Sequence, residues 1–243
     1  QVKQLLSKNK IERIITIGET IGTQLNDLPN VISFATTQEF LQHVRQPYKE
    51  KNKGQRFPEK STLYAIISAA FNKQIPISSV LQLTYPQFLH FAEDLEKLKQ
   101  DFIGYKESQN MLDFDDLLVL TKELLQTKEH IKVQVGLKNK YVMIDEYQDI
   151  NRLQADLIKL FSSVSGNVMA VGDDAQSIYA FRGADHSNIL HFPDEFGAKE
   201  VIKIEQNFRS TQQILDLANN LLLQATNKYD KKLFTLREEG DLP

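Results

Sequence analysis

The chain has 243 residues, of which 41% are hydrophobic and 25% are charged, so a packed core in one large or two small domains is expected. It contains no cysteine, which excludes disulfides, thiolate zinc sites and cysteine-held iron–sulfur clusters. Its net charge of -3 gives no general attraction to nucleic acid, so any such contact must come from local patches.

Hydropathy and the first residue of the sequence lead to two expectations, one about the compartment of the protein and one about the length of the parent chain. No apolar run approaches the roughly 18 residues of a membrane span, and the start carries no signal-peptide pattern. We therefore expect no membrane partner and a cytoplasmic location. Because the first residue is Gln1 rather than Met, we interpret the sequence as a piece of a longer chain.

The first sixty residues are the least informative part of the sequence. Apolar runs at 13–17 (RIITI) and 31–34 (VISF) predict short strands, and Thr36 with Glu39 predicts a capping box for a short helix. The glycines of GETIGTQ, residues 18–24, resemble a phosphate loop only superficially, because the spacing is one residue short and no lysine follows the second glycine. We interpret that stretch as a turn or loop.

A basic stretch with interleaved aromatics follows at 45–60 (RQPYKEKNKGQRFPEK). It holds six basic residues against two acids, with Tyr48 and Phe57 among them. Basic side chains with aromatics between them suit a nucleic-acid backbone and its bases. A solvated, mobile loop is the alternative, because charge runs usually have that structure.

Residues 61 to about 104 have a helical pattern. Apolar residues recur at helix spacing from Leu63 onward and again from Phe88 onward. Pro76 and Pro86 separate the segments. This part carries no chemistry by itself.

The stretch 112–125 (LDFDDLLVLTKELL) predicts a strongly amphipathic helix. Asp113 stands where an N-cap belongs, and Asp115 and Asp116 complement the positive end of the helix dipole. Capping alone explains the three aspartates, and a catalytic role is the alternative. The predicted buried stripe consists of Leu117, Leu118, Leu120, Leu124 and Leu125.

A fully apolar run at 141–144 (YVMI) predicts a strand buried on both faces, as in a parallel sheet. Asp145, Glu146, Gln148 and Asp149 follow at once. Ligands of open α/β sheets bind just beyond the carboxyl ends of strands. An acidic pair there can hold Mg²⁺ and orient a water for phosphoanhydride hydrolysis. The alternative is that these acids merely cap the next helix.

A helix with one apolar face is predicted at 151–164, followed by a second strand at 167–171 (NVMAV). That strand ends in the polar loop GDDAQSIYAFRGAD, where Gly172 lets the chain turn. If the two strands are neighbours, three polar residues of this loop stand beside the first acidic cluster: Asp173, Asp174 and Gln176.

A third strand is predicted at 201–204, and it ends in the loop 205–211 (EQNFRST). A helix starts there, with Ser210 and Gln213 as a capping box. Its predicted core face consists of Ile214, Leu217, Ala218 and Leu221. Polar groups from three strand ends on one edge of a sheet predict a functional site rather than a stability device.

The loops, in this order, resemble motifs of the UvrD/Rep/PcrA-type superfamily-one DNA helicases. DEYQD resembles their Walker B motif, GDDAQSIYAFRGA their third helicase motif, and QNFRST their fourth. LDFDDLL is similar to a segment that these enzymes carry just before Walker B. The resemblance is specific from 111 to 222 and faint from 61 to 104, where the family places its helical insertion, subdomain 1B. Before residue 60 it is not evident.

The resemblance implies roles around ATP and Mg²⁺, the cofactors of the family. Asp145 would bind magnesium together with Glu146, which would also polarise the attacking water. Gln148 would belong to the nucleotide-binding residues. Gln176 would sense the γ-phosphate and couple it to DNA.

The same resemblance implies contacts by aromatic and basic residues. Phe208 would stack on adenine, where Tyr is common, and Arg209 would reach the γ-phosphate as an arginine finger, which suits charge developing on a phosphoryl group. Tyr179, Phe181 and Arg182 would lie near single-stranded DNA. Phe181 stands where relatives often carry Trp, which reduces the surface for base stacking.

The sequence also departs from the family pattern. It contains no G-x-x-x-x-G-K-S/T, so the phosphate-cradling loop and its lysine are missing, and so are the fifth and sixth helicase motifs. We therefore expect an α/β fold with a partial RecA-like (P-loop NTPase) parallel sheet and a mostly helical 1B-type subdomain. The expected parts are an N-terminal segment (1–60), a 1B-like subdomain (61–110), the later half of the first motor domain (111–205) and the start of the second (206–243).

The resemblance implies a fragment of an ATP-dependent DNA helicase that steps along single-stranded DNA, 3′ to 5′, and meets duplex DNA, as in DNA repair. One alternative is a subunit of a helicase–nuclease complex. Another is a non-catalytic DNA- or partner-binding module with an incomplete ATP site, against which the intact Asp145, Glu146, Gln176 and Arg209 argue. Without a phosphate loop, the chain by itself is expected not to hydrolyse ATP.

Overall fold

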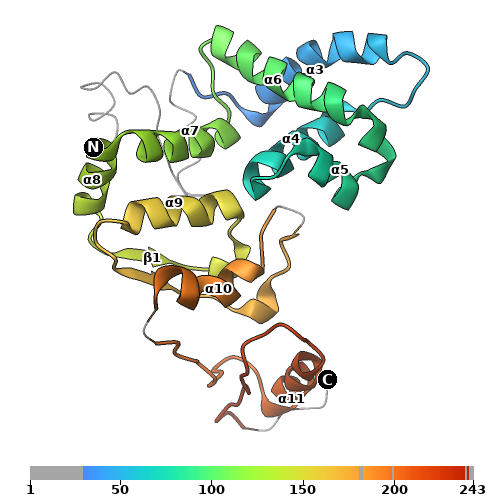
Figure 1. Cartoon of the computed structure of the whole chain (residues 1–243). Helices are drawn as coiled ribbons and strands as arrows, with labels where there is room; N and C mark the ends of the chain where they lie inside the picture. Colours follow the sequence, from blue (N-terminus) through green and yellow to red (C-terminus); the bar gives the residue numbers. More distant parts are fainter. Residues whose placement is uncertain (1–29, 181–182, 199, 239, 241–243) are drawn as a thin grey trace. The chain divides into compact units, whose positions relative to one another are not determined.

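The protein is described by a computed structural model, which covers residues 30–180, 183–198, 200–238 and 240 (Figure 1). It is mostly helical, with one small parallel sheet. The chain divides into two compact units, Gln1–Lys140 with Asn151–Ser165, and Tyr141–Ile150 with Gly166–Pro243. The strand predicted at 13–17 and the turn predicted at 18–24 lie outside the described residues.

The regular elements described in the first unit are all helices. They are α3 (Phe34–Lys51), α4 (Lys60–Lys73), α5 (Ile77–Thr84), the 3-10 helix η1 (Pro86–Phe91), α6 (Ala92–Ser108), α7 (Phe114–Thr127), α8 (Glu129–Lys138) and α9 (Arg152–Ser162). The helical pattern predicted for 61–104 is confirmed. Figure 1 shows α3 to α6 gathered into one bundle, drawn from blue to green, in which α3 packs on α4 and α6.

The beginning of α3 corrects two predictions. Val31 forms an isolated parallel bridge with Leu112 instead of a strand, and the helix already begins at Phe34. Its N-cap is Ser33, whose hydroxyl accepts the N–H of Thr36 at 3.3 Å. The capping box predicted at Thr36 is wrong because a better-placed cap stands three residues earlier.

The core of the bundle is apolar and continuous. Seven of its residues have no exposed surface: Leu41, Leu63, Ile66, Ile77, Leu81, Leu95 and Leu98. Fully burying a side chain of this size stabilises the fold by about 1.5–3 kcal/mol. The helices of this unit are therefore held by packing on one another, both between neighbours in sequence and between distant helices such as α3 and α6.

The basic stretch 45–60 contributes two residues to this core. The Arg45 side chain is buried; its Nε donates to the Pro58 carbonyl at 2.7 Å, and its guanidinium pairs with Glu59 at 3.1 Å. Phe57 is buried against Phe91, with ring centroids 5.1 Å apart. The stretch is thus neither wholly a mobile loop nor a free basic and aromatic surface, because its first half is the end of α3 and one of its aromatics is in the core.

The aspartates at the start of α7 are structural. Asp113 accepts the N–H of Asp116 at 3.0 Å, and Asp116 accepts the N–H of Asp113 at 2.9 Å, which is a complete capping box. Lys106 is buried and places its Nζ 2.7 Å from each carboxylate. The N-cap prediction is confirmed, and of the predicted stripe Leu117 and Leu125 are buried while the other three are half-buried.

The third aspartate joins three helices through side chains. Asp115 accepts from Nδ2 of Asn72 at 3.2 Å, and Oδ1 of Asn72 accepts from Asn151 at 2.9 Å. Asn151 is the N-cap of α9, in a reciprocal box with Gln154. Burial, followed by the charge of Asp113, raises the pKa of Asp115 to about 6.

The second unit contains the sheet. Its elements are β1 (Val142–Ile144), the 3-10 helix η2 (Tyr147–Asp149), β2 (Val168–Ala170), the 3-10 helix η3 (Asp174–Gln176), α10 (Ser187–Phe196) and α11 (Gln212–Leu223). The two strands pair in parallel, with Val142 opposite Val168 and Ile144 opposite Ala170. The expectation that these strands are neighbours is confirmed.

Two other predictions about the sheet are wrong. Because side chains alternate along a strand, Met143 and Met169 share one face, and they are 73% and 53% exposed, so the strands are not buried on both faces. Residues 201–204 form no strand in the structure, and the chain there pairs only at the bridge between Gln206 and Phe234. A strand requires a partner along its length, and none of the described residues supplies one there.

The last helix also differs from its prediction. The N-cap of α11 is Thr211, which makes no side-chain capping bond, so the box of Ser210 with Gln213 is wrong. Leu215 is buried, whereas three residues of the predicted core face are exposed (Ile214, Leu217 and Leu221) and the fourth, Ala218, is half-buried. Among the described residues, no helix combines the length and the apolar character needed to cross a membrane.

Candidate functional site

The loops that follow β1 and β2 lie side by side. Backbone pairing continues past the strands, because the N–H of Val171 donates to the Ile144 carbonyl at 2.8 Å and the N–H of Tyr147 donates to the Val171 carbonyl at 2.9 Å. Tyr147 is buried and meets the ring of Phe192 edge-on, with centroids 5.0 Å apart. The polar residues of both loops are therefore collected at the carboxyl ends of the strands.

The acidic pair after β1 is exposed and held in an unusual backbone conformation. Glu146 has φ 51° and ψ 44°, in the left-handed region that a non-glycine residue rarely adopts. Its N–H donates to Oδ1 of Asp145 at 3.0 Å, and its Oε2 accepts from Nε2 of Gln148 at 2.7 Å. Such strain persists only where the surroundings fix it, and it is common at functional sites.

Gln148 is the link between the two loops. Its side chain is only 1% exposed. Its Oε1 accepts the N–H of Asp173 at 2.9 Å, while its Nε2 donates to Glu146. Since one end must accept and the other must donate, the amide can adopt only one orientation. The structure thus places Gln148 beneath the loops rather than on the open surface.

Gly172 is required for close packing of the loop and not for the turn expected there. A Cβ at this position would stand 2.6 Å from Oε1 of Gln148 and 2.8 Å from Cδ1 of Ile189. Real Cβ atoms essentially never approach other atoms so closely, and the backbone here is not in the left-handed region. The glycine is required because the loop passes directly over Gln148.

The loop after β2 is occupied by a lysine from beyond α11. Nζ of Lys231 forms ion pairs with Oδ1 of Asp173 and, at 2.5 Å, with Oδ1 of Asp174. The N–H of Tyr229 donates to Oδ2 of Asp174 at 2.9 Å, and Nε2 of Gln176 donates to Oδ2 of Asp173 at 2.8 Å. The predicted proximity of this loop to the acidic pair is confirmed, but its carboxylates face a lysine that sequence reasoning missed.

The charges of this lysine and its partners stabilise one another. Burial alone would raise the pKa of Asp173, but the hydrogen bonds from Lys231 and Gln176 outweigh it and hold that pKa below its usual range. Burial alone would lower the pKa of Lys231, but Asp173 and Asp174 outweigh it and raise that pKa. The lysine is therefore charged at neutral pH and neutralises much of the acidity of the loop.

The QNFRST loop is shaped by its asparagine. Oδ1 of Asn207 accepts the N–H of Arg209 at 2.8 Å, and the side chains of Phe208 and Arg209 are exposed. Nη1 of Arg237 donates to the Arg209 carbonyl at 2.7 Å. Within the described residues, no hydrogen bond or ion pair joins the Arg209 guanidinium to the acidic pair after β1.

Of the three residues expected near DNA, the structure describes one. Tyr179 is half-buried, and its carbonyl accepts the N–H of Ala184 at 3.3 Å. Phe181 and Arg182 lie outside the described residues.

The acidic pair fits a magnesium ion in part. The hydrogen bonds from the Glu146 N–H and from Gln148 use one oxygen of Asp145 and one of Glu146, and oxygen is the ligand atom that Mg²⁺ prefers. In the part of the chain that the structure describes, however, no group of three or more His, Asp or Glu side chains could hold a metal by itself. Asp145 and Glu146 could therefore supply only some of the ligands of a magnesium ion, and substrate phosphates and waters would have to supply the others.

The chain is mostly helical, and its two parallel strands end in acidic and amide-bearing loops at one edge of the sheet, which is the edge where open α/β sheets bind ligands. A family model of the UvrD/REP helicase N-terminal domain matches residues 5–197. The chain belongs to this family. The match extends to residue 5, so the similarity that was not evident before residue 60 is present there as well.

Individual relatives support the same assignment. The chain is 37% identical to the ATP-dependent DNA helicase Rep of Buchnera aphidicola over 150 residues, 62% of this chain and 23% of that protein. It is 36% identical to a probable DNA helicase II homolog of Rickettsia felis over 186 residues, 76% of this chain and 26% of that protein. It is 43% identical to Rep of Escherichia coli over 126 residues, 52% of this chain and 19% of that protein. The chain thus spans about a fifth to a quarter of these relatives.

Proposed function

We propose that this chain contributes part of the catalytic site of an ATP-dependent DNA helicase, in which hydrolysis of ATP is coupled to movement on single-stranded DNA, 3′ to 5′. The membership in the family and the names of the relatives support this proposal. The observation that carries it is the buried Gln148, which links Glu146 to the loop that bears Gln176. This link connects a carboxylate suited to activating a water with an amide suited to sensing a phosphate.

The residues of the two loops suggest which of them would take each role in ATP hydrolysis. Asp145 would ligate the magnesium ion that accompanies ATP, and that ion supplies charge neutralisation at the phosphates. Glu146, fixed by its backbone conformation and by Gln148, would accept a hydrogen bond from the attacking water. Gln176 now donates to Asp173, and it would have to leave that carboxylate to reach a phosphate.

The remaining contacts are proposed from exposure and chemical type. Phe208 and Arg209 are exposed on one loop, which leaves an aromatic face for a base and a guanidinium for a phosphate. Tyr179 would lie along single-stranded DNA, because an aromatic ring can stack on any base. We also propose that the helices within 61–110 form a 1B-like subdomain.

A substitution of Glu146 tests the catalytic proposal. In the natural polypeptide that carries this sequence, Glu146→Gln should retain ATP binding and lower single-turnover hydrolysis by about 10²–10⁴-fold, because a positioned base contributes about that much. Glu123→Gln, an exposed glutamate on α7, is the matched control and should hydrolyse ATP like the unmodified protein. Hydrolysis close to the unmodified rate in Glu146→Gln would remove Glu146 from the mechanism.

A second candidate, a binding module that does not itself turn over ATP, is favoured by one observation. The 243 residues contain no G-x-x-x-x-G-K-S/T, whose backbone N–H groups and lysine would position the phosphates. The purified 243-residue chain should therefore show no ATP turnover above its Glu146→Gln variant, with magnesium and single-stranded DNA present. Turnover above that variant would mean that another segment, GETIGTQ included, positions the phosphates.

A further inference from the structure

The segment 228–234, which follows α11, is attached to the loop after β2. Its Lys231 side chain is only 14% exposed and pairs with both Asp173 and Asp174. The hydroxyl of Tyr229 donates to the Ile189 carbonyl of α10 at 3.0 Å, in addition to the bond from its N–H to Asp174. The side chains of Tyr229 and Lys231 and the N–H of Tyr229 therefore hold the segment against this loop and against α10.

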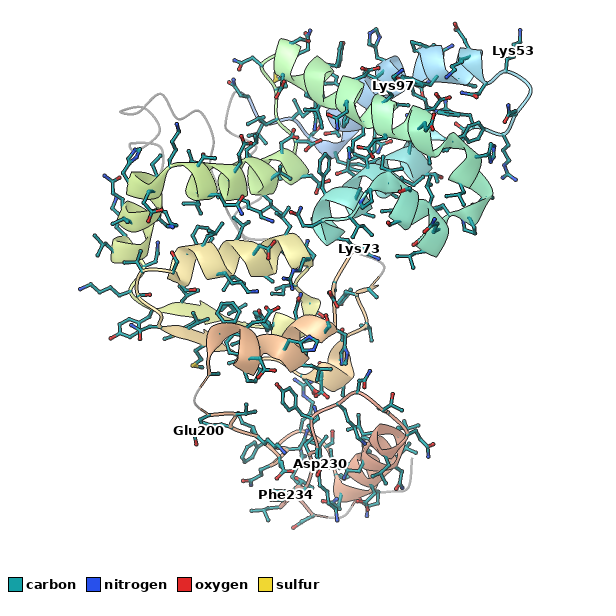
Figure 2. The ribbon with its side chains drawn as sticks, viewed as in Figure 1. Lys53, Lys73, Lys97, Glu200, Asp230 and Phe234 are labelled. Atoms are coloured by element: carbon teal, nitrogen blue, oxygen red, sulfur yellow. The ribbon has the colours of Figure 1, made fainter. Side chains whose placement is uncertain are left out.

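The same segment is attached, a few residues later, to the chain that leads into Phe208 and Arg209. The N–H of Phe234 donates to the Glu205 carbonyl at 3.0 Å, and the N–H of Asn207 donates to the Phe234 carbonyl at 2.7 Å. Figure 2 labels Asp230 and Phe234, which flank Lys231 in this segment. A displacement of the Phe208–Arg209 loop would therefore act directly on the residues around Lys231.

From Asp173 a chain of hydrogen bonds leads to Glu146. The N–H of Asp173 donates to Gln148 at 2.9 Å, and Gln148 donates to Glu146 at 2.7 Å. Gln148 is buried, and the glycine at 172 leaves the space that its amide oxygen occupies, since a Cβ there would stand 2.6 Å from that oxygen. A movement of Asp173 would therefore reach the Glu146 carboxylate through the side-chain amide of Gln148.

We infer that Lys231 is a positioning residue, which holds Asp173 and, through Gln148, the Glu146 carboxylate. The inference rests on the proposed function, because it assumes that Glu146 acts on the attacking water. The inference also says which part of the chain controls which: segment 228–234, which pairs with the residues just before Phe208 and Arg209, sets the position of the Glu146 carboxylate. Lys231 touches neither nucleotide nor DNA in this account.

The charges explain why a lysine is suited to this position. Without Nζ, the buried carboxylate of Asp174 and the partly exposed carboxylate of Asp173 would lie close together without a cation, and each would favour a position closer to water. Any such movement of Asp173 shifts the N–H that orients Gln148. A neutral side chain of the same length should therefore preserve the packing and remove the positioning.

The test compares three variants of the natural polypeptide in ATP hydrolysis stimulated by single-stranded DNA. Lys231→Met should lower kcat by about tenfold while the KM for ATP changes less than about twofold, because groups that orient reacting residues typically contribute on that order. Lys231→Arg, which keeps the charge, should recover most of kcat. Lys232→Met removes the same charge from the next, exposed residue and should behave like the unmodified protein.

Three results would overturn the inference. They are an unchanged kcat in Lys231→Met, an equal loss in Lys232→Met, and a loss that tracks thermal stability with no rescue by arginine. Should Lys231→Met fail to fold, Asp173→Asn is measured instead, and an unchanged kcat there overturns the inference equally. Failure of the proposed function is recognised separately, because then Glu146→Gln itself would retain turnover.

Discussion

The two units differ in where their apolar side chains go. In the helical unit, most leucines and isoleucines of α3 to α6 are buried against one another, with Leu83 as an exposed exception. In the unit with the sheet, large apolar residues are exposed on the strands, on the chain after α10 and on α11: Tyr141, Met143, Ile202, Ile204, Leu221 and Leu236. The helical unit thus buries more of its large apolar side chains against its own residues than the unit with the sheet does.

The difference follows from the range of contacts that each architecture needs. A helix makes its backbone hydrogen bonds within its own residues, so the helices of a bundle need partners only for their apolar faces. A strand must be paired and covered, and a two-stranded ribbon is marginally stable by itself. We therefore expect the helical unit to be the more stable of the two.

The largest effect is expected from breaking the buried ion pairs in the helical unit. Lys106→Met leaves Asp113 and Asp116 buried without their cation, and the loss of one partner from a buried pair costs about 3–5 kcal/mol. Urea unfolding followed by far-UV circular dichroism measures this loss. Lys97→Met, on the exposed side of the same helix and labelled in Figure 2, should change the unfolding free energy by less than about 0.5 kcal/mol. Equal effects of the two substitutions would show that the pairs do not stabilise the unit.

A leucine in each unit sharpens the comparison. Leu95 has no exposed surface and Leu217 is 50% exposed, although both occupy apolar positions of amphipathic helices. Leu95→Ala should lower the unfolding free energy by about 3 kcal/mol through lost burial and a cavity. Leu217→Ala should lower it by less than about 0.5 kcal/mol. A large loss in Leu217→Ala would mean that α11 is covered in solution, against the exposure described above.

The third prediction concerns the pH dependence of the helical unit. Because the pKa of Asp115 is raised to about 6 in the folded state, the folded protein binds a proton more tightly than the unfolded chain does. Stability from this group is full below the unfolded pKa of about 3.9 and is lost as the pH rises through about 6. The groups that face it are Asp113 and Lys106, with Ser68 and Asn72 as hydrogen-bond donors.

Asp115→Asn removes this titration and keeps an oxygen for Asn72. Relative to the unmodified protein, it should gain on the order of 2 kcal/mol of stability at pH 7.5 and little at pH 4, because the protonated acid and the amide are alike in charge. Unfolding in urea at both values provides the measurement, with Glu123→Gln on the exposed face of α7 as the control. A gain that does not depend on pH would contradict the raised pKa.

The two units also differ in how much of their fold could be predicted from the sequence. Helical periodicity and the Asp113 cap predicted α4 to α7 well, because those signals are local. The third strand was predicted from four apolar residues, but a strand exists only where a partner is present. The burial of Arg45 and Phe57 could not be read from a charge run, since it depends on the packing of α3 against its neighbours.

The candidate site shows the same division. The residues of the DEYQD and GDDAQ loops could be identified from sequence, and their proximity followed from the pairing of two parallel strands. The left-handed conformation of Glu146 and the bridging amide of Gln148 depend on how the loops meet in three dimensions. Lys231 is separated from Asp173 by 58 positions, and the only sequence signal for it is the need of two adjacent aspartates for a cation.

The smallest effect is expected at the basic stretch, where the structure redefines which residues can reach DNA. Lys51 is paired with Asp94 at 2.6 Å, and the Tyr48 hydroxyl donates to Asp101 at 2.6 Å. Four exposed cations of the stretch have no such pair among the described residues, and we choose the three that precede the buried Phe57: Lys49, Lys53 and Arg56 (the fourth is Lys60). Changing these three to Gln in the natural polypeptide should reduce the slope of log K against log salt for single-stranded DNA by about 2, because each phosphate contact contributes about 0.7. Fluorescence anisotropy at several salt concentrations measures the slope, and a matched triple substitution elsewhere on the helical unit is the control: Lys97, Lys128 and Lys138 to Gln. Equal slopes in the two triples would show that this stretch is a solvated surface, and that DNA contacts belong to the loops of the other unit.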